Sequence, residues 1–255
     1  MHPPHKKLSN AAISADQPRT VSDSFGSISL PAGVLWGAQT ARSLQFFAIG
    51  EQRMPMDVVH ALALIKWAAA CVNCDLTVQA PEIARAIANA SNRVAAGEFD
   101  DQFPLSVWQT GSGTQSNMNV NEVIANLATQ DSALGAKSNQ KVHPNDDVNL
   151  GQSSNDVFPT AMHIAVALKV KSTLTPALEE LISALSAKAL EFESIVKIGR
   201  THLQDATPIT LGQEFGGYGA QLLLCQQNLL STMNAVHKLA IGGTAVGTGL
   251  NTHPD

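Results

Sequence analysis

Apolar residues spaced three and four positions apart fill most of the chain after residue 57, and this spacing predicts helices. The first helix is expected to bury one face, made of Val58, Leu62, Ile65, Ala69, Val72 and Leu76. A second should open at Pro81, a favourable first-turn residue, and stop at Gly97. Its inward residues are expected to be Ile83, Ile87 and Val94.

A third helix is expected to follow Thr114, to bury Val120, Ile124 and Leu127, and to fade near Gly135. Two longer helices are predicted beyond it. One starts near Pro159 and is interrupted or kinked at Pro176, because proline lacks the N–H that a helix interior needs. It uses Ile164, Leu168, Leu174, Leu178, Leu181 and Leu185. The other runs from about Gly212 to Leu239 and uses Leu222, Cys225, Leu229 and Val236.

The amino-terminal residues 1–22 show no apolar period and predict a disordered tail. Gly26–Leu30 alternates briefly and predicts one short strand or hairpin arm, and little else resembles a sheet. The fold class is therefore mainly α. We expect a small helical domain over residues 23–149, then the first part of a bundle of long helices over 150–255.

Composition narrows the class of protein. Only 15% of the 255 residues are charged and 44% are apolar, which suggests that helical surface is buried against other subunits. The net charge of -5 and the lack of Lys/Arg clusters disfavour a nucleic-acid partner. No run of about 18 consecutive apolar residues predicts a membrane span, and a cytoplasmic protein is expected.

Three cysteines fit a reducing compartment better than a disulfide framework. Cys71 and Cys74 form a C-x-x-C within an apolar helical pattern, without a second pair or nearby histidines. They are interpreted as packing residues, and no metal site is expected.

Four polar segments interrupt the helices. The first, residues 110–117, places Ser112 and Thr114 where a helix begins, and free N–H groups there can hold an anion. The third, residues 151–156, repeats this arrangement with Ser153, Ser154 and Asn155. A simple helix cap is the alternative for each. The second, residues 141–147, contains His143, Asn145 and Asp146, and is either a second anion site or a structured loop.

The fourth segment, residues 199–208, contains His202, the best acid-base candidate because histidine titrates near neutrality. A packing role is the alternative. Thr201, Gln204, Asp205 and Thr207 surround it in sequence with partners that could fix its tautomer. Together the four segments predict a site in which hydroxyl and amide donors hold a small dianion beside an imidazole.

Five stretches, residues 111–119, 141–149, 152–160, 199–208 and 242–251, closely resemble class II fumarate hydratases of the aspartase/fumarase superfamily. Gly-Ser-Gly-Thr-Gln-Ser-Asn-Met-Asn and Gly-Arg-Thr-His-Leu-Gln-Asp-Ala-Thr-Pro are two of them. The resemblance runs from about Phe25 to Asp255 and implies reversible hydration of fumarate to L-malate, in a metal-independent homotetramer without a cofactor. The chain would be an amino-terminal part of such an enzyme.

The resemblance also implies residue roles. Ser112, Thr114 and Asn155 would bind substrate carboxylates, with Ser153 and Ser154 in support. Thr201 and His202 would lie at the reacting end, where His202 positions or activates the water. His143, Asn145 and Asp146 match the family's second dicarboxylate site.

The chain departs from the family pattern in two places. Gln140 stands where the family often has an arginine, which puts anion binding at the second site in doubt. The family's loop with a catalytic serine, a lysine and an asparagine is absent from these 255 residues, so the chain alone is expected to show no hydratase activity.

Two other functions remain open. Aspartate ammonia-lyase has the same fold, but its usual motif carries Gln where this chain has His202. The chain is alternatively an inactive helical fragment or an assembly partner for longer subunits.

Overall fold

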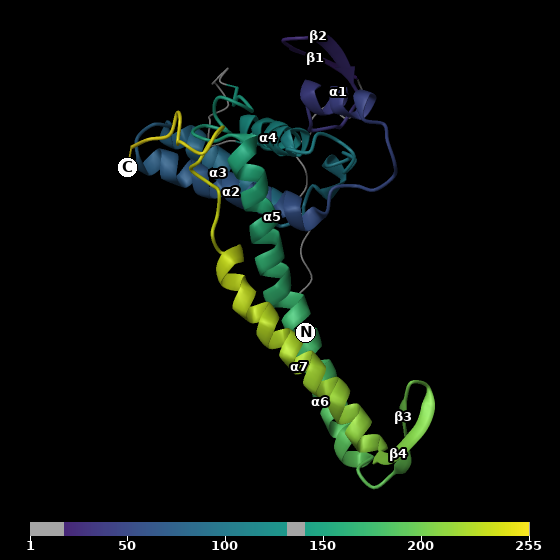
Figure 1. The fold of residues 1–255 in the computed structure, drawn as a ribbon. Coiled ribbons are helices and arrows are strands. Elements are labelled where there is room, and N and C mark those ends of the chain that lie inside the picture. Colours follow the sequence, from purple (N-terminus) through teal and green to yellow (C-terminus); the bar gives the residue numbers. More distant parts are fainter. Residues whose placement is uncertain (1–17, 132–140, 255) are drawn as a thin grey trace, which may run out of the picture. The chain divides into compact units, whose positions relative to one another are not determined.

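The computed structural model describes residues 18–131 and 141–254, which form two compact units. The first unit contains the residues up to Ala161 together with Ala240–Asp255, and the second contains Met162–Leu239. Figure 1 shows the elements of both. The mainly α prediction is confirmed, since helices make up most of the described elements. Part of the predicted tail, residues 1–17, lies outside the described residues.

The first unit begins with a β-hairpin of β1 (Arg19–Asp23) and β2 (Gly26–Leu30), in which Val21 pairs with Ile28. The strand prediction for β2 is correct. The tail prediction is wrong for residues 19–22, because Arg19 donates from its guanidinium to the carbonyls of Val34 and Trp36 and thereby ties β1 to the chain that follows. Helix α1 (Ala38–Phe46) comes next.

Helices α2 (Met56–Asp75), α3 (Pro81–Ala95) and α4 (Thr114–Thr129) form the core of this unit. The inward residues predicted for α3 and α4 are buried: Ile83, Ile87, Val94, Val120, Ile124 and Leu127. A short 3-10 turn, η1 (Asp100–Gln102), lies between them. The predicted end of the third helix near Gly135 falls outside the described residues, and α4 ends at Thr129.

The inward face predicted for α2 is partly wrong. Leu62 and Ile65 are buried, but Val72 is 53% exposed and Lys66 is completely buried. The helix is apolar on nearly every side, so periodicity alone does not select one face. By length and composition α2 could also cross a membrane. It packs on α3 and α4 as a core helix, and core helices can be as long and as apolar as a membrane span.

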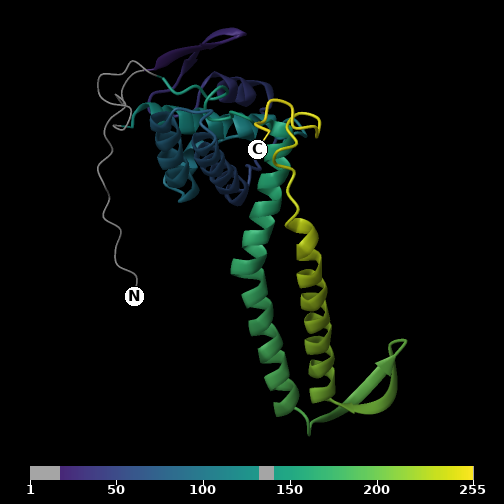
Figure 2. The same cartoon turned by 90° about the vertical axis from the view of Figure 1, so that its left-hand side faces the viewer.

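The second unit is a pair of long helices. Helix α5 (Ser154–Lys169) begins in the first unit and continues through a π-helical turn, η3 (Val170–Leu174), into α6 (Thr175–Glu191). Pro176 follows this turn at the start of α6, where its missing N–H and its ring are tolerated because the turn has already widened. The helix is not broken at Pro176 as predicted: the α-helical pattern is interrupted by the π-helical turn before it and continues through Pro176. Helix α7 (Leu211–Val236) runs beside α6 (Figure 2).

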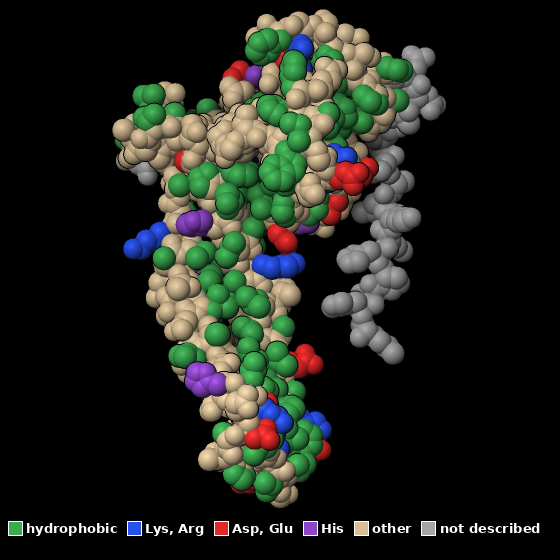
Figure 3. Space-filling view, turned by 45° about the vertical axis from the view of Figure 1, so that its right-hand side comes forward, with side chains coloured by type: hydrophobic (Ala, Val, Ile, Leu, Met, Phe, Trp, Pro, Cys, Tyr) green, Lys and Arg blue, Asp and Glu red, His purple; other side chains and the backbone are tan. Residues whose placement is uncertain are grey.

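Several residues expected to be inward in these helices are exposed. Leu178 and Leu185 are half-buried between α6 and α7, whereas Leu168, Leu174, Leu181 and Cys225 are exposed. No residue of α6 is fully buried. A pair of helices covers only one side of each member, so the remaining apolar positions face outward. Figure 3 shows hydrophobic side chains interspersed along this surface, with few charges among them.

A second hairpin, β3 (Val196–Thr201) paired with β4 (Gln204–Thr210), connects α6 and α7. The expectation of little further sheet is wrong here. The hairpin is mostly exposed, so neither face requires apolar residues and its sequence shows no alternation of apolar and polar positions. It also contains Gly199 and Pro208, which are unusual within strands. The last residue of β4, Thr210, joins the hairpin to α7 through a capping box, in which its side chain accepts from the backbone N–H of Gln213.

The compact units do not coincide with the division expected at residues 149 and 150. The first turns of α5 and the segment 240–255 belong to the first unit. The predicted domain boundary stays a prediction.

Candidate functional site

The amino terminus of α4 carries free donors, as the first polar segment predicts. Gly113 is the N-cap and has no side chain to contribute, while the N–H of Ser116 donates to Gln109 Oε1 at 3.0 Å. The backbone N–H groups of Thr114 and Gln115 have no partner among the described residues. Ser112 Oγ and Thr114 Oγ1 lie 2.9 Å apart at the same end. Thr114 does not act as a cap, so this helix end can accept an anion.

Gly113 fixes the approach of this loop to α5. Its φ of 68° is left-handed, and a Cβ added there would lie 2.3 Å from the ring of Phe158. Phe158 belongs to the same first turns of α5 as Ser154 and Asn155. Contact between Gly113 and Phe158 therefore brings the first and third polar segments together.

The third segment is capped by its own side chains. The N–H of Asn155 donates to Ser153 Oγ at 3.3 Å, and the N–H of Ser153 donates to Asp156 Oδ1 at 3.0 Å. The cap alternative is thus correct for Ser153, which serves α5 itself. Asn155 is exposed and Ser154 is half-buried. Asn155 Nδ2 donates to Ser153 Oγ at 3.2 Å, whereas the Ser154 side chain has no partner among the described residues.

Asp156 also holds the fifth family stretch. Its Oδ2 accepts from the N–H of Gly242 at 3.0 Å and from the N–H of Thr244 at 2.9 Å, and the residue is 2% exposed. A buried carboxylate that receives backbone donors from two segments fixes their spacing. The stretch 242–251 is therefore anchored to the start of α5.

The second segment forms a tight turn around its histidine. The Nδ1 of His143 accepts from the N–H groups of Asn145 and Asp146, at 3.3 and 3.1 Å. Two donated hydrogens at Nδ1 require the neutral tautomer with its proton on Nε2, so the 3.2 Å approach of Asp146 Oδ2 to Nδ1 is not an ion pair in this form. Asp147 Oδ2 accepts from the N–H of His143. These bonds account for a structured loop, and anion binding at His143 stays a prediction.

Lys66 connects the polar segments through buried hydrogen bonds, and the sequence pattern did not identify it as a site residue. Its Nζ donates to Asn149 Oδ1 at 2.7 Å and to Gln152 Oε1 at 3.0 Å. Asn149 Oδ1 also accepts from the side-chain amides of Asn117 and Asn121, at 3.1 and 3.3 Å. Burial lowers the pKa of Lys66 to about 7, and the charge of Asp156 opposes this shift. A lone lysine inside the apolar run Ala61–Ala70 was the available signal.

His202 occupies the tip of the β3–β4 hairpin in the second unit. Thr201 pairs with Gln204, so His202 and Leu203 form a two-residue turn, with φ of 49° and 63°. Such a turn is usually built from Asn and Gly, since other residues are strained at positive φ. The imidazole is exposed and has no partner among the described residues, and Asp205 pairs with Arg200 instead. The expected support of its tautomer by neighbours is not found within residues 18–131 and 141–254.

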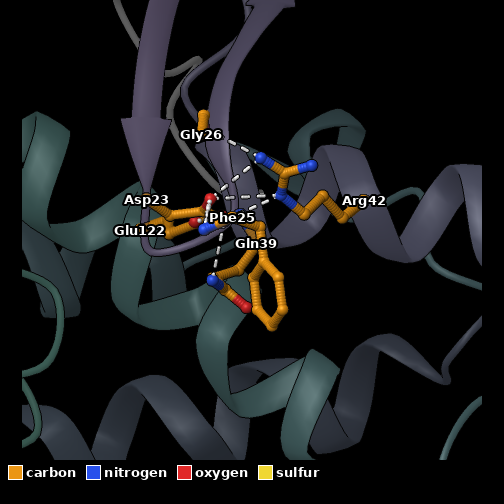
Figure 4. Close-up of polar contacts among 6 residues, drawn as sticks. All are labelled: Asp23, Phe25, Gly26, Gln39, Arg42 and Glu122. Carbon is orange, nitrogen blue, oxygen red and sulfur yellow. Dashed lines mark hydrogen bonds and ion pairs between the residues drawn. The ribbon is translucent and has the colours of Figure 1, made fainter.

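An ion pair anchors the first hairpin beside the first polar segment (Figure 4). Both oxygens of Asp23 accept from the guanidinium of Arg42, and Asp23 Oδ2 accepts from Gln39 Nε2 at 2.9 Å. The hydrogen bonds from Arg42 lower the pKa of the Asp23 carboxyl. Next to the pair lies an open hollow lined by Phe25, Gln39, Arg42, Ser43, Phe46, Phe47 and Gln115.

The first unit therefore gathers Ser112, Thr114, Ser153, Ser154 and Asn155, with the second segment joined through Asn149. Thr201 and His202 lie in the other unit. No group of three or more metal-ligating side chains occurs in the part of the chain that the structure describes.

Helix starts that present uncharged donors are suited to holding a small anion. A family model described as lyase matches residues 26–255, and the chain belongs to this family. It is 62% identical over 239 residues to a class II fumarate hydratase of Methylorubrum extorquens, covering 93% of this chain and 50% of that protein. A homologue of the same name from Nitrosomonas europaea is 58% identical over 240 residues.

Solved structures agree. A class II fumarase from Schistosoma mansoni superimposes with a TM-score of 0.89 at 47% identity, covering 93% of this chain and 50% of that chain. The predicted kinship with class II fumarate hydratases is thereby confirmed. The chain spans about half the length of the curated relatives that it matches.

Proposed function

We propose that this chain supplies the dicarboxylate-binding half of a fumarate hydratase site, which interconverts fumarate and L-malate. The observation that carries the proposal is the meeting of two helix starts, at Thr114 and at Ser154, whose donors are hydroxyls, amides and backbone N–H groups. Neutral donors at helix starts stabilise a carboxylate without an intervening cation. The relatives named above are called fumarate hydratases.

In the dehydration of L-malate, a base removes the proton next to one carboxylate. The hydroxyl on the neighbouring carbon then takes up a proton from an acid and leaves as water, which gives fumarate. The charge that develops on the carboxylate is what Ser112, Thr114 and Asn155 would stabilise. His202 would position the water or share its proton, and Thr201 would lie beside it. Because the imidazole is exposed on a hairpin tip, residues of another subunit would enclose it.

A homotetramer is part of the proposal. Leu174, Leu181 and Leu190 are 42%, 48% and 75% exposed on the α6 side of the helix pair. Apolar helix faces of this length are stabilised by packing on further helices. A cytoplasmic location and the absence of a required cofactor stay predictions.

The test joins residues 1–255 to the part of the Methylorubrum extorquens relative that follows the matched region. We expect this chimera to remove the ultraviolet absorbance of fumarate, and the 255-residue chain alone to leave it unchanged. Turnover by the chain alone would contradict the division of the site. A folded tetrameric chimera that releases ammonia from aspartate but does not hydrate fumarate would establish the alternative lyase.

Two variants of the chimera separate the role of the imidazole from that of the turn. His202→Asn keeps a side chain that tolerates positive φ but removes the imidazole, and we expect kcat to fall about 100-fold or more. Leu203→Gly relieves the neighbouring strained position and should preserve activity. Equal activity in both variants would remove His202 from the mechanism.

A further inference from the structure

Lys66 is the one fully buried lysine of the described residues, and it contacts no carboxylate. Its two hydrogen-bond acceptors are the amide oxygens of Asn149 and Gln152. Burying an amine without a carboxylate in contact is costly, and the charge of Asp156 offsets only part of this cost. Apolar residues surround Lys66 along α2. An apolar residue at this position could not make these two hydrogen bonds to the loop 148–152.

The two acceptors lie at the junction of three polar segments. Asn149 lies two residues after the second segment. Its Oδ1 also accepts a hydrogen bond from Nδ2 of Asn117 in α4, three residues after Thr114. Its Nδ2 donates to the carbonyl of Gln152 at 3.2 Å. Gln152 immediately precedes Ser153, Ser154 and Asn155, and its Nε2 donates to the carbonyls of Val148 and Leu150. One amine therefore connects the loop 148–152 to α2, and through Asn149 to α4.

We propose that Lys66 is a positioning residue, which sets the distance between the Thr114 and Asn155 carboxylate-binding segments through Asn149 and Gln152. The contacts of Lys66 do not depend on the proposed function. The effect of Lys66 on substrate binding rests on that function. Two donated hydrogens suffice, so both the ammonium and the neutral amine can hold the loop. Lys66 does not touch the substrate in this assignment.

The first experiment uses the 255-residue chain and needs no activity. Lys66→Met keeps the length of the side chain and removes both donors, while Leu62→Ala, one turn earlier on the same helix, removes apolar packing and keeps both donors of Lys66. At conditions matched for global stability, we expect backbone hydrogen exchange over residues 148–156 to accelerate at least 10-fold more in Lys66→Met. Equal exchange in the two variants overturns the inference.

The second experiment places the same variants in the chimera. Displaced carboxylate-binding groups should raise KM for fumarate and lower kcat/KM by about 100-fold in Lys66→Met. Leu62→Ala should keep the KM of the parent. An unchanged KM in Lys66→Met, with an active parent, refutes the positioning role. A folded parent without hydratase activity refutes the proposed function instead, and the exchange experiment then decides the case of Lys66.

Discussion

Glu122, in the middle of α4, accepts a hydrogen bond from Thr40 Oγ1 at 2.6 Å and closes the amino terminus of α1. The same carboxylate accepts from the backbone N–H groups of Gly37, Gln39 and Thr40, and it is 4% exposed. A negative charge at a helix start is favoured by the helix dipole. The helix that carries the first polar segment is thereby attached to the first hairpin and α1.

Glu122→Gln should destabilise the chain by about 2 to 4 kcal/mol, because one amide NH₂ would then face backbone donors. Urea denaturation measures the change. Glu98→Gln is the matched control. Both side chains of the Arg93–Glu98 ion pair are exposed to solvent, and such pairs contribute about 0 to 1 kcal/mol to stability. Equal losses in the two variants would contradict the capping role of Glu122.

Gly113→Ala should cost about 2 to 4 kcal/mol, from a left-handed backbone and from collision with the ring of Phe158. Thermal unfolding checks this. Gly111→Ala, two residues earlier, meets nothing within 4 Å and should change stability little. A Gly113→Ala protein as stable as the parent would show that Phe158 does not fix this loop.

Asp156→Asn should loosen the segment 242–244, since an amide replaces a carboxylate oxygen that accepts from Gly242 and Thr244. We expect faster hydrogen exchange at these two amides and a loss of about 1.5 to 3 kcal/mol. Asp101→Asn, whose carboxylate makes an exposed contact with Gln102, serves as the control. Unchanged protection at residues 242 and 244 would argue against the anchor.

Lys66 gives stability a pH dependence. Its folded pKa of about 7 lies below its ordinary value of 10.5, so the unfolded chain binds more protons between these values. The contribution of Lys66 therefore opposes folding at low pH and is relieved as pH rises through the window from about 7 to 10.5. Relative to Lys66→Met, the free energy of unfolding should rise by about 2 kcal/mol between pH 7 and pH 9. Parallel pH profiles for the two proteins would contradict the shift.

Much of the fold could be predicted because local chemistry specifies it. Pro81 and Gly97 bracket α3, and the period of Ile83, Ile87 and Val94 identifies its buried face. The glycines and hydroxyls of residues 110–114 place a helix start, since such residues favour loops and caps over helix interiors. The family motifs identified the lyase relationship, which the comparisons confirm.

Tertiary structure decided which residues are buried and which strands pair where the local sequence pattern allows more than one answer. In α2, apolar residues occur on nearly every side, so only contact with α3, α4 and the loop 148–152 selected Lys66 for the interior and left Val72 outside. The β3–β4 hairpin lacks alternation, and the pairing of Thr201 with Gln204 became visible only in three dimensions. Sequence establishes which segments can offer donors to an anion. Which segments meet depends on long-range contacts such as Lys66 with Asn149, because those are set by packing between residues 83 positions apart.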